Sequence, residues 1–198
     1  MARPRSFDED QVIDRVTRTF WERGYANTSI TDLEAATGLG RQSLYSAFGD
    51  KHALFLKALE RYATYGDLQT PAAAYNSHAP LVQLKCMLRS TIDFATSPDA
   101  PGACLMVQAM LEFGENDPAV QSCCKANNSR VETWVGRLIA EATANKTLAP
   151  SLNPLAVTTL VMAQYYAIPV MARAGVPGDQ LRSSVDLLMQ QITHNTSS

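Results

Sequence analysis

A run of polar side chains suited to nucleic-acid recognition lies between residues 41 and 51. Arg41, Gln42, Ser43 and Tyr45 follow a glycine-containing corner and alternate with apolar residues. Arginine can form two parallel hydrogen bonds to guanine, and glutamine can do the same to adenine. A serine or tyrosine hydroxyl can reach a base edge or a phosphate, and Lys51 can hold a phosphate as a point charge. These residue types predict a surface that binds double-stranded DNA.

Two short helices joined by a glycine corner are expected to position this surface. Ser29 or Thr28 can cap the first helix, and Gly38 can end it. The second helix is predicted over residues 40–49, with apolar side chains that anchor it on a core. Such a pair over about residues 28–48 is typical of a helix-turn-helix, whose second helix enters the major groove.

The charge of the chain is distributed evenly, so a DNA-binding face must arise from the placement of charges. The formal net charge is -2, and residues 1–65 hold nine Lys and Arg against nine Asp and Glu. Arg3 and Arg5 precede the first expected helix and form a basic arm that can contact the minor groove or a phosphate.

Helical periodicity continues through most of the chain, and no alternation typical of β-strands occurs. We therefore expect an all-α protein of about nine helices. Residues 1–65 are predicted to form a three-helix DNA-binding domain, and residues 66–198 a helical domain for ligand binding and dimerisation. Residues 66–79 lack a clear period and are interpreted as a linker or a frayed helix end.

Several other classes of protein fit the sequence poorly. The N-terminus is polar and shows no signal peptide, which predicts a cytoplasmic protein with reduced cysteines. The apolar run 156–172 is short for a membrane span, so no membrane contact is expected. Cysteine spacing predicts no metal site, and we expect no cofactor. With three histidines and no nucleophile or phosphate-loop motif, the protein is not expected to be an enzyme.

The region from residue 5 to about 65 resembles the DNA-binding domain of TetR-type transcriptional regulators. The match is carried by FWERGYANTSITDLEAATGLGRQSLYSAFGDKHALFLKALE, including the Gly-Tyr after the first helix and the Leu-Tyr-x-x-Phe of the third. The family places residues that commonly touch DNA at Thr28, at 41–43, at Tyr45 and at Lys51. His52 departs from the pattern, because an acidic residue is usual there.

The same resemblance implies a homodimer that binds a small-molecule effector in its C-terminal domain. Dimerisation is expected through helices of about 154–174 and 179–193, which are too apolar to stand exposed. Flexible methionines and amphipathic aromatic residues suit an adaptable pocket. The candidates for such a ligand site are Cys104, Met106, Met110, Phe113, Trp134, Met162, Tyr165 and Tyr166.

The sequence thus predicts a ligand-responsive regulator, most simply a repressor that releases a palindromic operator when a small molecule binds. One alternative is a thiol sensor acting through Cys104, because GACLMVQAMLEFGENDPAVQ at 102–121 resembles a subgroup with a Gly-x-Cys-Leu start to its sixth helix. Some members of that subgroup sense electrophiles or oxidants, whereas an ordinary Cys104 would be a buried, inert thiol. A second alternative is an architectural DNA binder without an effector.

Overall fold

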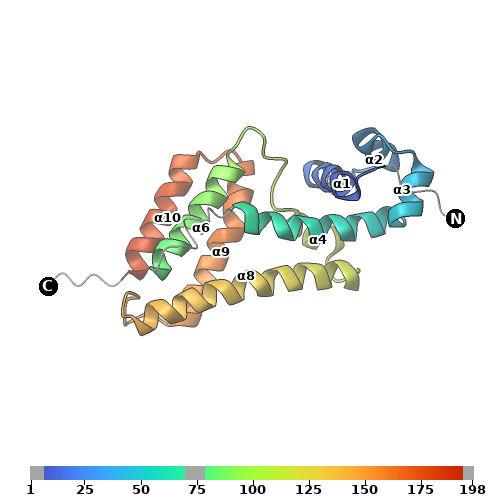
Figure 1. Ribbon diagram of the computed structural model, residues 1–198. Coiled ribbons are helices and arrows are strands. Elements are labelled where there is room, and N and C mark those ends of the chain that lie inside the picture. Colours follow the sequence, from blue (N-terminus) through green and yellow to red (C-terminus); the bar gives the residue numbers. More distant parts are fainter. Residues whose placement is uncertain (1–6, 70–78, 194–198) are drawn as a thin grey trace. The chain divides into compact units, whose positions relative to one another are not determined.

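The computed structural model describes residues 7–69 and 79–193. Nine helices and one isolated β-bridge, between Leu148 and Thr193, make up its regular structure over these residues (Figure 1). The expected all-helical fold is therefore confirmed. The chain forms two compact units, of which the first joins residues up to Tyr65 with Leu105–Cys124 and the second holds the rest.

The first unit contains four complete helices and parts of two longer ones. The complete helices are α1 (Glu9–Arg23), α2 (Ile30–Thr37), α3 (Arg41–Phe48) and α7 (Leu105–Phe113). The longer ones are α4 (Lys51–Gln69) and α8 (Pro118–Ala144). The ribbon of Figure 1 shows α2 and α3 following α1 as a short, angled pair, which is the expected helix-turn-helix.

Helix α1 is capped at its N-terminus and buries one face in this unit. The Asp8 carboxylate accepts the N–H groups of Asp10 and Gln11 at 3.0 and 3.3 Å, which caps the helix. Gly24, with φ of 77°, ends it. One face of α1 is buried through Val12, Val16, Thr17, Thr19, Phe20 and Trp21.

Helix α2 begins with a complete capping box. The Ser29 hydroxyl accepts the Asp32 N–H at 3.2 Å, and the Asp32 carboxylate accepts the Ser29 N–H at 2.8 Å. Gly38 ends the helix in the left-handed conformation, with φ of 74° and ψ of 8°. Because this conformation costs any residue with a Cβ, glycine fits the corner that turns the chain into α3.

Loss of this cap should destabilise the first unit measurably. We expect Ser29→Ala to lower the free energy of unfolding by about 0.5–2 kcal/mol, since α2 would lose an acceptor for its first turn. Urea denaturation followed by circular dichroism would measure the change. Ser46→Ala, at an exposed position inside α3, is the matched control and should change stability by less; equal losses would contradict a capping role.

The second unit is built on α6 (Pro80–Ala95), α9 (Pro154–Arg173), α10 (Gly178–Ile192) and the later part of α8. Helices α6, α9 and α10 pack side by side (Figure 1). Both α6 and α9 start with proline, and Asn153 caps α9 by accepting the N–H of Leu155 at 2.9 Å. Apolar side chains from all four helices form one continuous core.

Ion pairs join α6 to α10 along one side of this core. Arg89 and Lys85 both contact Asp186 at 2.9 Å, and Arg182 contacts Asp93 at 2.8 Å. The hydrogen bonds from Lys85 and Arg89 hold the pKa of Asp186 below its usual value. Since these side chains are substantially exposed, they fix the register of the two helices more than they stabilise the fold.

Helix α9 has an unusually apolar exposed surface. By length and composition alone it could cross a membrane, but this test is also passed by helices of soluble cores. One side of α9 packs on α6 and α10. Large apolar side chains that remain exposed on α9 and α10 are Leu155, Leu160, Val170, Met171 and Leu187.

Two expected boundaries can be compared with the structure. Helix α4 continues to Gln69, which fits the frayed helix end that is one of the two interpretations of residues 66–79, and residues 70–78 lie outside the described part of the chain. Residues 105–124 belong to the same compact unit as α1 to α3. This compact unit is therefore larger than the segment 1–65. The assignment of DNA binding to 1–65 and of ligand binding to 66–198 stays a prediction.

Candidate nucleic-acid interface

Helix α3 separates its polar residues from its apolar ones. Arg41, Gln42 and Ser43 are exposed at its first turn, whereas Leu44 and Phe48 are buried. The apolar pair anchors the helix against the unit, so the three polar side chains project from a fixed platform. This is the arrangement required of a helix that enters the major groove.

The N-terminus of α3 is organised by a side chain from α2. Gly40 provides no side-chain cap, and the Glu34 carboxylate accepts the Arg41 N–H at 2.6 Å instead. The Arg41 guanidinium lies over the Tyr45 ring, with 5.2 Å from Cζ to the ring centroid. Because this contact restricts the long side chain without using all its donors, Arg41 remains able to pair with a base.

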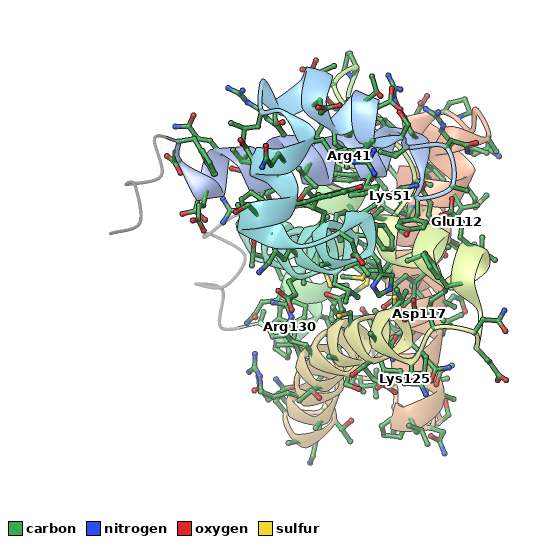
Figure 2. The ribbon with its side chains drawn as sticks, turned by 90° about the vertical axis from the view of Figure 1, so that its right-hand side faces the viewer. Arg41, Lys51, Glu112, Asp117, Lys125 and Arg130 are labelled. Atoms are coloured by element: carbon green, nitrogen blue, oxygen red, sulfur yellow. The ribbon has the colours of Figure 1, made fainter. Side chains whose placement is uncertain are left out.

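Lys51 lies at the start of α4, where Figure 2 labels it together with Arg41. Its ammonium group is 4.1 Å from the centroid of the Tyr25 ring, and Asp50 caps the helix beside it by accepting the Ala53 N–H at 2.8 Å. Partial burial lowers the pKa of Lys51, and the nearby Glu112 and Asp32 carboxylates oppose this effect. The aromatic contact therefore fixes the position of a cation that we expect at a phosphate.

One of the residues expected at DNA, Thr28, is placed less favourably than the others that the structure describes. The Thr28 side chain is 0% exposed, and its hydroxyl donates to the Gly24 carbonyl at 2.7 Å. In this geometry Thr28 stabilises the turn before α2, and its hydroxyl has no open path to a phosphate. Arg3 and Arg5 lie outside the described residues.

A hydrogen-bonded network holds α1 on α4 behind the helix-turn-helix. Arg61 donates from Nε and Nη2 to the two oxygens of Asp14 at 2.6 and 3.0 Å, and the Tyr65 hydroxyl donates to the same carboxylate at 2.8 Å. The hydrogen bond from Arg61 is the main cause that holds the pKa of Asp14 below its usual value. Burial, followed by the bond to Asp14, raises the pKa of Tyr65.

This network predicts a pH dependence of stability. Asp14 stays ionised to lower pH in the folded chain than in the unfolded one, so its stabilisation is complete above the unfolded pKa of about 3.9. It is lost as pH falls from there through the depressed folded pKa. Asp14→Asn should lower stability at neutral pH by about 0.2–1 kcal/mol, since the pair is partly exposed.

The same variant should flatten the loss of stability as pH falls below the unfolded pKa of about 3.9, where Asp14 begins to gain its proton. Denaturant titrations at a series of pH values would measure this slope. Asp99→Asn, in an exposed loop of the second unit, is the control. If stability falls as steeply with decreasing pH in Asp14→Asn as in the wild type, this pH dependence does not come from Asp14.

The predicted ligand residues divide between the two units. In the first unit, Met106 is buried, Met110 is exposed, and Phe113 packs against Tyr25 and Phe55 with ring centroids 4.9 and 5.5 Å apart. Phe113 thus belongs to an aromatic cluster beside the helix-turn-helix. A role for these three residues at a ligand stays a prediction.

In the second unit, Cys104 is 8% exposed and directly precedes α7. Met162 is buried in the core, while Trp134, Tyr165 and Tyr166 are half-buried against it. The Tyr166 hydroxyl donates to Asn128 at 3.1 Å, so one polar atom of this aromatic group already has a partner.

Two of the hollows on the described part of the second unit are lined by none of the predicted ligand residues. One, of about 450 Å³, lies between α8 and α9, and the other, of about 730 Å³, lies near the start of α6 and the end of α10. Lys85 and Asp186 line the larger one with apolar neighbours. Over residues 7–69 and 79–193, no group of three or more potential metal ligands occurs.

Sequence reasoning missed the acidic side chains that support the interface. Glu34 caps α3, and Glu112 accepts the N–H groups of Tyr25 and Ala26 at 2.8 and 3.3 Å. The departure at His52 is accounted for, because its Nε2 lies 2.5 Å from the Asp117 carboxylate. Only the spacing of Glu34 from Arg41 is short enough to suggest a local contact from the sequence.

Comparison with known families identifies the chain. The model for bacterial regulatory proteins of the TetR family matches residues 12–58, and the model for the tetracyclin repressor-like C-terminal domain matches residues 80–185. The second match alone covers more than half of the 198 residues. The protein belongs to the TetR family of transcriptional regulators.

Individual relatives support this assignment over nearly the whole chain. The HTH-type transcriptional repressor ComR of Escherichia coli K12 is 23% identical over 181 residues, covering 91% of this chain and 86% of ComR. A cysteine mutant of the TetR family regulator CifR, solved with a 26-bp operator duplex, has a TM-score of 0.84 at 26% identity. That match covers 96% of this chain and 100% of the CifR chain.

Proposed function

We propose that the protein is a ligand-responsive repressor that binds a palindromic operator as a homodimer in the cytoplasm. The observation that carries the proposal is the first turn of α3, where Arg41, Gln42 and Ser43 are exposed on a helix anchored by Leu44 and Phe48. The relatives support this reading, because CifR was solved on operator DNA and ComR is a repressor. In this role the chain binds and releases DNA and catalyses no reaction.

Exposed apolar side chains on α9 and α10 support dimerisation. Leu160 and Val170, which lie about three helical turns apart on α9, are 51% and 46% exposed, and Leu187 on α10 is 58% exposed. Ala163 lies between the first two and is also exposed, so another helix can approach closely. A second copy of the same face would cover these residues in a four-helix arrangement.

An effector would act by favouring one arrangement of the dimer over another. Two α3 helices must be set about 34–36 Å apart to reach successive major grooves. A ligand that binds more tightly to a dimer with a different spacing shifts the population away from DNA. The half-buried position of Trp134, Tyr165 and Tyr166 beside the apolar core supports a ligand site with an amphipathic lining.

Selection of bound sequences from a random duplex library, at one near-physiological salt concentration, tests this function. We expect enrichment of a palindrome whose half-sites match a two-fold symmetric dimer. Absence of enrichment together with a steep salt dependence would indicate only phosphate attraction and would favour an architectural DNA binder.

The enriched duplex then serves to find the effector class. Compounds that release it reversibly would indicate a ligand pocket, and oxidants or electrophiles that release it would indicate a thiol switch. Cys104→Ser distinguishes the two, because the variant should keep its response to a reversible ligand. Its response to oxidants should disappear only if Cys104 is the sensor, and the low exposure of this thiol argues against ready reaction.

A further inference from the structure

The carboxylate of Glu112, on the last turn of α7, holds the turn that leads from α1 into the helix-turn-helix. Its Oε2 accepts the N–H of Tyr25 at 2.8 Å and that of Ala26 at 3.3 Å. These two N–H groups lie in the turn between Gly24 and Ser29, and their side-chain acceptor comes from a distant part of the chain. Figure 2 labels Glu112 with Lys51 and Asp117.

The position of Glu112 also accounts for Gly24. A Cβ at residue 24 would collide with Oε1 of Glu112, and the φ of 77° independently disfavours a side chain there. The same turn is closed by the Thr28 hydroxyl on the Gly24 carbonyl and by the Thr28 N–H on the Tyr25 carbonyl at 3.2 Å. The carboxylate thus completes a turn that is already restricted on its other side.

Tyr25 connects this turn to the candidate DNA contacts. Its ring lies 4.1 Å from the Lys51 ammonium and packs against Phe55 and Phe113 with centroids 4.9 Å away. Displacement of the Tyr25 backbone would therefore move the ring on which Lys51 rests. Glu112 lies close enough to favour the charged form of Lys51, but it makes no direct hydrogen bond to that cation.

We propose that Glu112 is a positioning residue for DNA binding, which fixes the Tyr25 turn and thereby the orientation of Lys51 and the entry of α2. The inference rests on the proposed DNA-binding function. Two further contacts from residues 108–117 support it. The Gln108 amide donates to the Trp21 carbonyl at 3.3 Å, and the Asp117 carboxylate pairs with the His52 ring. Residues 108–117 therefore act as a support of the helix-turn-helix.

The test compares Glu112→Ala with Glu112→Gln. The amide oxygen of glutamine can still accept the two N–H groups, whereas alanine provides no acceptor. We expect Glu112→Ala to weaken binding to the selected duplex about tenfold, and Glu112→Gln to stay within about threefold of the wild type. Both substitutions remove the same negative charge, so a loss of affinity confined to the alanine variant cannot come from charge.

Glu115→Ala is the matched control, because this exposed carboxylate lies outside the contact and its loss changes the charge equally. Equal affinity in Glu112→Ala and the wild type would overturn the proposal, and so would equal weakening in the alanine and glutamine variants. Amide hydrogen exchange at Tyr25 and Ala26 gives a second readout that needs no DNA. Exchange should accelerate in Glu112→Ala and remain slow in Glu112→Gln; unchanged exchange would overturn the contact itself.

Failure of the proposed DNA-binding function can be distinguished from failure of the positioning role of Glu112. If selection enriches no duplex for the wild type, but exchange at the two amides responds as expected, the proposed function is wrong and the positioning of the turn stands. If the wild type binds and neither affinity nor exchange responds to Glu112→Ala, the positioning role is wrong and the function stands.

Discussion

Replacement of Leu160 by glutamate should separate the dimer and lower affinity for the palindromic duplex by about 10²–10⁴-fold. Leu160 is 51% exposed on α9, and the proposed partner helix would cover it. A carboxylate in this interface would be desolvated, and two-fold symmetry would bring a second buried carboxylate from the other copy. The monomer would then bind one half-site at a time and lose the gain from simultaneous binding.

Light scattering after gel filtration would measure the mass, and fluorescence anisotropy the affinity. Val82→Glu is the matched control, because Val82 is 49% exposed on α6 and lies outside the proposed dimer face. It should remain dimeric and bind DNA as the wild type does. A Leu160→Glu protein that keeps the mass and affinity of a dimer would show that this face is not the interface.

The boundaries of the helix-turn-helix could be predicted because they depend on neighbours along the chain. Ser29 and Asp32 lie three residues apart and close the capping box without help from any other element. Gly38 and Gly49 are each required by a positive φ at a helix end. Such signals are local, so the sequence contains all the information that they need.

Contacts between distant segments could not be predicted in the same way. Glu112 is 87 residues from Tyr25 in the chain, and His52 is 65 residues from Asp117. No periodicity or spacing links these pairs, because only the packing of residues 105–124 against the N-terminal helices of the same unit brings them together. The packing of the Phe113 ring against Tyr25 and Phe55 could not be predicted for the same reason, and its role at a ligand stays a prediction.

Thr28 illustrates a different limit. A threonine before a helix is typical both of a cap and of a phosphate contact, and residue type alone does not distinguish these roles. In the structure Ser29 provides the cap, and the Thr28 hydroxyl bonds backward to Gly24. The choice depends on the conformation of the turn, which in turn depends on Gly24 and on the carboxylate of Glu112.

Arg41→Ala should weaken binding to the selected duplex by about 1–3 kcal/mol, which is about 5- to 150-fold. The side chain is exposed on the first turn of α3, and the Glu34 carboxylate fixes the backbone from which it projects. Its guanidinium rests on Tyr45, so little conformational freedom remains to be lost on binding. Anisotropy titrations on the selected duplex and on a scrambled one, at the same salt concentration, would measure the effect.

The comparison between the two duplexes decides what Arg41 does. If Arg41 pairs with a base, its loss should weaken binding to the selected duplex far more than to the scrambled one. Lys57→Ala removes one positive charge from an exposed position on α4 and should change both affinities little and equally. An equal loss on both duplexes in Arg41→Ala would mean that Arg41 contacts only phosphate. Specificity would then have to come from Gln42 and Ser43 on the same turn of α3.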